Sequence, residues 1–275
     1  MLRKLEDTQF NIRRDKFIGI YLFLCYNYVE WRYIMIVIKN VSKSYDKRNK
    51  VIKDLNLRIE DGEIFGFLGP NGAGKSTTIK MITGILDIED GEITINNHSI
   101  KNEPEEAKKC FGYVPDSPDM FLKLKGIEYL NFMADIYEVS LEERTKKIEE
   151  LTKLFEINDV LNDKIQSYSH GMRQKIVIIG SLLHQPDNWI IDEPMTGLDP
   201  KSTFELKKIM RKIADNGHTV FFSTHILDVA EKLCDRIGII NNGELLFVGT
   251  INEMRNELKE NKSLEELFME IIKND

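Results

Sequence analysis

The 275-residue chain has few cysteines and no excess of basic residues. Its three cysteines, Cys25, Cys110 and Cys234, are odd in number, far apart and without metal-ligand spacing. This pattern predicts packing residues in a reducing compartment rather than disulfides or a metal centre. The net charge is -7. Because neutralising a phosphate backbone needs a basic face, this charge argues against a nucleic-acid partner.

A hydrophobic run of membrane length is also missing. The apolar segment "FIGIYLFLCYNY" is shorter than the ~20 residues that a membrane helix needs, and Glu30 and Arg32 follow it closely. Basic residues precede it, as in a signal peptide, but no small-residue cleavage site is evident. We interpret residues 1–34 as an N-terminal extension, either poorly ordered or upstream of the natural start at Met35.

Internal repeats and low-complexity linkers are absent too, so the organisation of residues 35–275 must follow from the order of elements. The pattern from Val37 is rich in strands, and strands later alternate with helices. This order predicts an α/β fold with a mainly parallel sheet, covered on both faces and carrying active groups at the carboxyl ends of its strands. We expect a C-terminal helix at about residues 250–273.

A helical insert is expected at about residues 124–185. Ser140 and Glu143 have the spacing of a capping box, which marks the start of a helix. Its apolar face would consist of Leu141, Ile148, Leu151, Leu154 and Phe155.

The segment "GPNGAGKST" has the spacing of a phosphate-binding loop and stands between an apolar strand and a helix. Its glycines allow backbone amides to approach phosphates, which the helix N-terminus also attracts. Lys75 would reach the β- and γ-phosphates, and Ser76 would give its hydroxyl to Mg²⁺. The predicted nucleotide-binding residues are Gly69, Pro70, Asn71, Gly72, Ala73, Gly74, Lys75, Ser76 and Thr77.

The segment "WIIDEP" supplies the expected second half of this site. A strand carries Asp192 to its end, where a carboxylate can hold the metal's water shell. Glu193 follows and could orient and activate water for attack on the γ-phosphate. An Asp-Glu pair at a strand end is commonplace by itself, and the preceding loop is what favours this interpretation.

The segment "YSHGMRQK" predicts a second anion site, because Ser169 and Gly171 open another helix. One nucleotide already has its phosphate cradle at residues 69–77. The second loop is therefore expected to serve a nucleotide held by another copy of the fold.

Taken in order, "GPNGAGKST", "YSHGMRQK", "IIDEP", "GLDP" and "STH" make the chain from Met35 onward resemble the nucleotide-binding subunit of ABC transporters. The resemblance implies a P-loop NTPase core, an antiparallel β subdomain and the helical insert. It also implies that two such domains face head to tail and trap two ATP between the phosphate loop of one and the signature loop of the other.

Roles for single residues follow from this resemblance. Tyr45 resembles the aromatic residue that stacks on adenine, although an ordinary packed or surface tyrosine is an alternative. Asp199 resembles the residue that crosses the dimer interface, and a helix N-cap is an equally physical role. His225 resembles the switch histidine that contacts the γ-phosphate. Glu193 is the expected general base.

Two segments depart from the usual family pattern. Asp116 stands where the family commonly has glutamine; its carboxylate could still hold water or metal. His170 and Met172 replace the commoner glycine and glutamine of the signature. The form "YSHGM", with "DEPMTGLDP" downstream, resembles the branch that serves ABC-2 type exporters of drugs, peptides or polysaccharides.

The resemblance implies a cytoplasmic ATPase subunit that uses ATP and Mg²⁺, forms a homodimer or heterodimer, and lies on the inner face of the membrane through a separate permease. The groove for that permease is expected near Asp116 and "SPDMFLKLKG". One alternative is a soluble ABC protein acting on ribosomes or DNA, which the single motif set and acidic charge disfavour. Another is a regulatory ATP clamp; Glu193 and His225 disfavour it, whereas Asp116 leaves it open.

Overall fold

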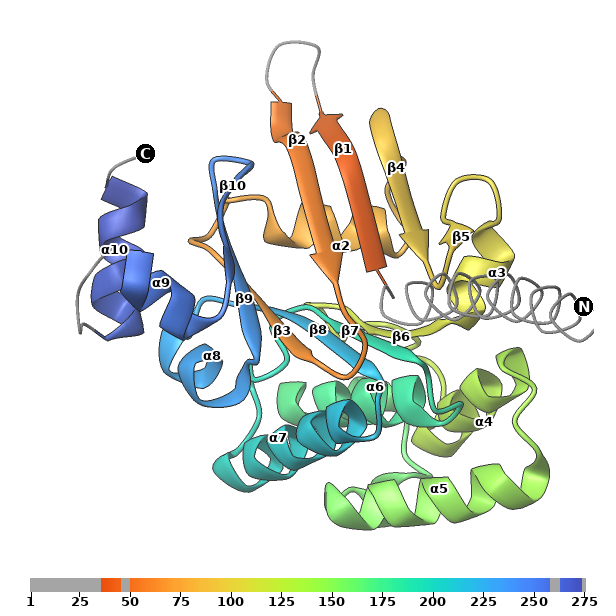
Figure 1. Cartoon of the computed structure of the whole chain (residues 1–275). Helices are drawn as coiled ribbons and strands as arrows, with labels where there is room; N and C mark the ends of the chain where they lie inside the picture. The colour runs from red at the N-terminus through yellow and green to blue at the C-terminus, as the bar shows by residue number, and fades with distance from the viewer. Residues whose placement is uncertain (1–35, 46–49, 258–262, 274–275) are drawn as a thin grey trace, which may run out of the picture. The chain divides into compact units, whose positions relative to one another are not determined.

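The computed structural model describes residues 36–45, 50–257 and 263–273 (Figure 1). The predicted N-terminal extension at residues 1–34, Met35 and Cys25 lie outside these ranges. Cys110 and Cys234 are free and pack against the apolar clusters, as predicted. In the described part of the chain, no helix is both long enough and apolar enough to cross a membrane.

The first of the two sheets is antiparallel, with the strand order β2-β1-β4-β5. From Leu55 to Ile59 buried and exposed residues alternate, so one face of β2 packs on the core while the other faces solvent. This sheet is the antiparallel β subdomain expected from the family resemblance. The bounds are Ile36–Ser44 for β1, Lys50–Ile59 for β2, Asp90–Ile95 for β4 and His98–Ser99 for β5.

The second sheet is mainly parallel, as predicted, with the order β10-β9-β3-β8-β7-β6. Only β10 runs antiparallel to its neighbour, through the hairpin turn at Asn242-Gly243. Strands β3, β7 and β8 are buried throughout, as expected for parallel strands covered on both faces. The bounds are Ile64–Leu68 for β3, Phe111–Val114 for β6, Asn188–Ile191 for β7, Thr219–Thr224 for β8, Arg236–Asn241 for β9 and Glu244–Gly249 for β10.

Helices cover the two faces of the parallel sheet and divide the core into separate clusters. Helix α2 (Lys75–Ile82) lies between the two sheets, where its apolar residues pack together with Phe221 of β8 (Figure 1). Val220 and Phe222 point to the opposite face and pack with α6 (His170–Leu182) and α7 (Pro200–Asp215). The short α3 (Pro104–Lys109) precedes β6.

The helical insert contains α4 (Gly126–Ile136) and α5 (Leu141–Leu154), followed by two 3-10 turns and α6. Ser140 caps α5 as predicted, because its hydroxyl accepts a hydrogen bond from the Glu143 amide at 3.3 Å. Within the predicted apolar face, Ile148 and Phe155 are buried, but Leu141 is 75% exposed. Leu141 is the first residue of the helix, and its side chain therefore lies beyond the edge of the core.

Beyond the sheet, α8 (Leu227–Leu233), α9 (Ile251–Glu257) and α10 (Leu264–Lys273) pack in a third cluster with β9 and β10. The predicted C-terminal helix at 250–273 corresponds to α9 and α10, and residues 258–262 lie outside the described ranges. Ser263 begins α10 as an N-cap, since its hydroxyl accepts a hydrogen bond from the Glu266 amide at 3.3 Å.

Candidate functional site

The phosphate loop lies between the carboxyl end of β3 and the start of α2, as the sequence predicts. Gly72 and Gly74 adopt left-handed backbone conformations, with φ of 82° and 112°. A Cβ at Gly74 would come within 2.5 Å of Ile52 in the antiparallel sheet, and one at Gly69 within 2.4 Å of the Ile240 carbonyl oxygen. Glycine is therefore required both by conformation and by close packing.

The Lys75 ammonium occupies the centre of this loop. It donates hydrogen bonds to the carbonyl oxygens of Gly69 at 2.8 Å and Pro70 at 3.3 Å. It also lies 3.6 Å from Glu193 Oε1. A buried cation held by neutral carbonyls and one carboxylate is a strong partner for a phosphate anion.

A cavity of about 570 Å³ opens over the loop. It brings together most of the residues that the sequence assigned to one nucleotide site, from segments far apart in the chain. Its lining consists of Val51, Pro70, Asn71, Gly72, Gly74, Lys75, Ser76, Thr77, Asp116, Glu193, Thr196 and His225.

Asp192 is buried beneath this cavity at the end of β7. Its Oδ1 accepts a hydrogen bond from Ser223 at 2.5 Å, whereas its Oδ2 has no hydrogen-bond partner among the described residues. Burial raises the pKa of the Asp192 carboxyl, although the neighbouring hydroxyls of Ser223 and Ser76 act in the opposite direction. A cation beside Oδ2 would stabilise the ionised form, so the site fits a metal ion.

The described residues hold no group of three or more His, Cys, Asp or Glu side chains that could bind a metal by itself. Mg²⁺ keeps several waters and is often bound by one or two protein carboxylates together with substrate phosphates.

Glu193 is held between two nitrogen groups at the edge of the cavity. Its Oε2 lies 3.0 Å from His225 Nδ1, opposite the contact that Oε1 makes with Lys75. The backbone of Glu193 has a φ of 49°, an uncommon value for a residue with a side chain. Its amide donates a hydrogen bond to Ser223 Oγ at 3.0 Å, which holds this conformation.

Ser223 was missed by the sequence analysis. Its hydroxyl donates to Asp192 and accepts from the Glu193 amide, so one buried side chain positions both members of the Asp-Glu pair. The signal was present in "FFSTH", where polar residues follow an apolar run at the end of a buried strand.

Asp116 and Tyr45 lie at the margins of the site. Asp116 follows β6 and lines the cavity, and its charge contributes to the raised pKa of Asp192 after the larger effect of burial. The Tyr45 ring is 64% exposed, and its hydroxyl lies 3.3 Å from Thr77 Oγ1. An exposed ring beside the phosphate loop is available for stacking.

Ser169 and Gly171 are not among the residues that line the cavity. Ser169 caps α6 by accepting a hydrogen bond from the Met172 amide at 3.3 Å. A Cβ at Gly171 would approach the Gly197 carbonyl oxygen to 2.5 Å, so the signature segment packs closely on the "GLDP" segment. The second loop therefore lies outside the cavity that opens over the phosphate loop.

Asp199 is the N-cap of α7, which was one of its two predicted roles. It accepts hydrogen bonds from the Ser202 amide at 2.9 Å and the Ser202 hydroxyl at 2.7 Å. The Lys175 ammonium lies 2.8 Å away, and this contact, with the Ser202 hydrogen bonds, lowers the pKa of the Asp199 carboxyl. Lys175 was not predicted to take part, and it ties the signature helix to the segment before α7.

Comparison with known proteins agrees with this geometry. The family described as "ABC transporter" matches residues 52–196. The chain is 36% identical over 242 residues to the ABC-type transporter ATP-binding protein EcsA of Bacillus subtilis, covering 88% of this chain and 98% of that protein. It is also 36% identical over 224 residues to the linearmycin resistance ATP-binding protein LnrL of the same organism, covering 82% and 72% respectively.

Two solved structures share the fold. One is an ATP-binding subunit of an ABC transporter, with a TM-score of 0.83, 33% identity and coverage of 86% of this chain and 99% of that one. The other is a dimeric ATP-binding cassette in a post-hydrolysis state with ADP and Pi, with a TM-score of 0.71, 27% identity and coverage of 79% and 99%. The chain therefore belongs to the ABC transporter family as an ATP-binding subunit with an ABC ATPase domain.

Proposed function

We propose that this subunit binds Mg·ATP at the phosphate loop, pairs with a second ATPase subunit, and hydrolyses ATP to power export through a separate membrane permease. The observation that carries the proposal is the position of Glu193. Its carboxylate is held between Lys75 and His225 at the edge of the nucleotide cavity. A γ-phosphate bound by Lys75 would therefore lie beside this carboxylate.

In the proposed hydrolysis, Lys75, Glu193 and His225 each have a different role. Lys75 exchanges its contact with Glu193 for the β- and γ-phosphate oxygens. Glu193, released from that ion pair, accepts the proton of the attacking water. His225 holds the other oxygen of Glu193 and contacts the γ-phosphate. Phosphoryl transfer depends mainly on such positioning and charge stabilisation.

Ser76 and Asp192 are the proposed Mg²⁺ site, with Asp116 as a further carboxylate at its margin. The Ser76 hydroxyl lines the cavity, and the buried Oδ2 of Asp192 is the atom without a partner among the described residues. When bound, Mg²⁺ supplies positive charge that neutralises the β- and γ-phosphates. Tyr45 is the proposed stacking residue for adenine.

Ser169 and Gly171 are proposed to complete a nucleotide site on the second subunit, which is either another copy or a related chain. They lie at the N-terminus of α6, where amides and a hydroxyl favour an anion. Asp199 is fixed beside them by Lys175 and would lie at the same interface.

An exposed aromatic patch on α4 and the segment before it is the proposed contact with the permease. The Phe121 ring lies 5.4 Å from Tyr129 and 5.5 Å from Phe132, and Phe121 and Phe132 are exposed. Asp119, in the same segment, pairs with Arg173 of α6 at 2.6 Å. Movement of this patch would therefore be passed to α6 through the Asp119–Arg173 pair. With the permease in the membrane, the subunit would lie at the membrane's cytoplasmic face.

Export is supported by the resemblance of "YSHGM" and "DEPMTGLDP" to ABC-2 type exporters. One relative is named as a linearmycin resistance ATP-binding protein, which is consistent with the proposed link to drug export.

The substitution Glu193→Gln tests the assignment of the base. We expect single-turnover phosphate release to slow by about 10²–10⁴-fold. ATP should bind as tightly as before or more tightly, because a negative charge beside Lys75 is removed. Glu142→Gln, on the exposed face of α5, is the matched control and should change neither value. An unchanged rate in Glu193→Gln would exclude the proposed base.

A further inference from the structure

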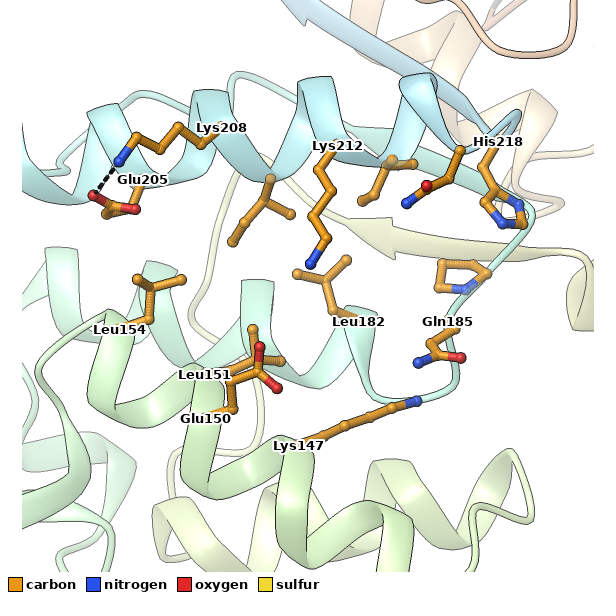
Figure 2. A pocket seen from close by; sticks show the side chains of 14 residues that line it. Lys147, Glu150, Leu151, Leu154, Leu182, Gln185, Glu205, Lys208, Lys212 and His218 are labelled. Carbon is orange, nitrogen blue, oxygen red and sulfur yellow. Dashed lines mark hydrogen bonds and ion pairs between the residues drawn. The ribbon is translucent and has the colours of Figure 1, made fainter.

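A second cavity, of about 520 Å³, lies between α5 of the helical insert and α7 of the core, beside the C-terminal end of α6 (Figure 2). It shares no lining residue with the nucleotide cavity. Its volume falls in the usual range of about 300–1,000 Å³ for small-molecule sites. Its apolar wall comes from all three helices and consists of Leu151, Leu154, Leu182, Ile209 and Ile213.

Several of the polar groups around this cavity already have partners. The Lys147 ammonium donates a hydrogen bond to the Leu183 carbonyl oxygen at 2.7 Å. Lys208 pairs with Glu205 at 3.1 Å, and both line the cavity. The His218 ring lies 3.5 Å from Asp187.

The Lys212 ammonium differs from these groups. Within residues 36–45, 50–257 and 263–273, no hydrogen bond or ion pair engages it. Figure 2 shows its side chain extending from α7 toward Leu182 on α6. An aliphatic stem along an apolar wall, ending in an unpaired cation, is complementary to an amphipathic anion.

The Glu150 carboxylate on the opposite wall does not cancel this charge. Glu150 lies close enough to Lys147 to affect its pKa. Burial lowers the pKa of the Lys147 ammonium, whereas the carboxylates of Glu143 and Glu150 raise it. Glu150 thus has the Lys147 ammonium nearby on its own helix. Asp215, three residues after Lys212 on α7, pairs instead with Arg211 at 2.9 Å.

We propose that this cavity is a binding site for a small amphipathic carboxylate. Its aliphatic chain would lie against the Leu and Ile wall, and its carboxylate would bind the Lys212 ammonium. Such a ligand would bridge the insert and the core at the end of α6 opposite Ser169. The site is independent of the nucleotide chemistry proposed above.

Submicellar decanoate is a suitable probe for the full chain. Its binding can be followed by calorimetry and by methyl NMR of leucine and isoleucine side chains. We expect saturable one-to-one binding with shifts at Leu151, Ile209 and Ile213. Decan-1-ol and decyltrimethylammonium share the chain without the anion, and each should bind about tenfold more weakly, which corresponds to one charge-assisted hydrogen bond.

Two variants separate the charge from the cavity itself. Lys212→Gln should weaken decanoate by about tenfold and leave decan-1-ol unchanged. Lys207→Gln, on the same helix but outside the cavity lining, is the matched control and should bind as the wild type does. Leu154→Trp should fill the space and abolish binding of both ligands.

Lys212 is exposed, so its replacement should not affect folding, and an equal melting temperature verifies this. The proposal is overturned if decanoate shows no saturable binding. It is also overturned if Lys212→Gln binds decanoate as well as Lys207→Gln does, or if decan-1-ol matches decanoate.

Discussion

The Lys175 ammonium on α6 lies 2.8 Å from Asp199, the N-cap of α7. One end of this contact belongs to the helix that begins with Ser169, and the other to the segment that follows Glu193. The pair therefore joins α6 to the segment between the Asp-Glu pair and α7 within one subunit.

Replacing Asp199 should destabilise the protein through the loss of two interactions, which two different variants can separate. Asp199→Asn keeps a good N-cap and removes the charge beside Lys175, whereas Asp199→Ala loses both. Because Asp199 is about half exposed, we expect a loss of under about 1 kcal/mol for the asparagine variant and about 1 kcal/mol more for alanine. Urea unfolding measures both values.

The pH dependence of this contact follows from the lowered pKa of Asp199. A carboxyl group with a lowered pKa in the folded state stabilises the protein above its unfolded pKa and loses that contribution as pH falls. The stability difference between wild type and Asp199→Asn should therefore shrink below about pH 4. A difference that stays constant into acid would contradict an ionised Asp199 paired with Lys175.

Ser223→Ala should weaken both folding and metal-dependent nucleotide binding. It leaves Asp192 Oδ1 without its donor and the Glu193 amide without its acceptor, in a fully buried position. We expect the free energy of unfolding to fall by about 1–3 kcal/mol. The Mg²⁺ concentration needed for half-maximal ATP binding should rise.

Ser181→Ala is the control for this effect. The Ser181 hydroxyl is also buried, and it accepts a hydrogen bond from the Trp189 ring at 2.9 Å. This variant should lose similar stability and keep the Mg²⁺ requirement of the wild type. Equal Mg²⁺ requirements in both variants would refute the positioning role of Ser223.

His184 should make the protein less stable in mild acid. Its ring stacks on Tyr137 with centroids 3.6 Å apart, and burial lowers its pKa to about 4. The unfolded chain takes up this proton first as pH falls, so folding stability is full above the unfolded pKa and declines below it. We expect this residue to account for a loss of about 2 kcal/mol between about pH 7 and about pH 5.

His184→Phe keeps a ring against Tyr137 and removes the titration. The variant should lose less stability than the wild type over the same pH interval, as measured by urea unfolding. A slope equal to that of the wild type would show that His184 is not held neutral in the folded protein.

Gly243→Ala should disturb the turn of the β9–β10 hairpin, which packs against β2 of the other sheet. Gly243 has a φ of 79°, and a Cβ there would lie 2.1 Å from the Val51 carbonyl oxygen of β2. Gly217 has a φ of 87° with no atom within 4 Å of a Cβ, so Gly217→Ala measures the conformational effect alone. Both variants should lower the free energy of unfolding, and Gly243→Ala should lower it by about 1–3 kcal/mol more than Gly217→Ala does. Equal losses would exclude the steric contribution.

The phosphate loop, the Asp-Glu pair and the parallel sheet could be predicted because each depends on neighbouring residues in the chain. A glycine-rich turn between strand and helix is a local signal, and so is alternation of strands and helices. The assignment of Ser169 to another subunit's nucleotide also came from the sequence and stays a prediction.

Contacts between distant segments could not be predicted in this way. Ser223 holds Asp192 across two neighbouring strands, and Lys175 meets Asp199 because α6 packs against the start of α7. Residue type alone does not specify such pairs, since serines and lysines occur both in the core and on the surface of the described part of the chain. The exposure of Leu141 likewise depends on where the α5 helix meets the core.

The most direct test of the account is the mass in solution of Glu193→Gln, with and without Mg·ATP, beside the double variant Glu193→Gln/Ser169→Arg. The account predicts an ATP-dependent dimer for the first protein and a monomer for the second, because the signature loop closes the partner's nucleotide site. A dimer that forms equally well in the double variant would contradict it.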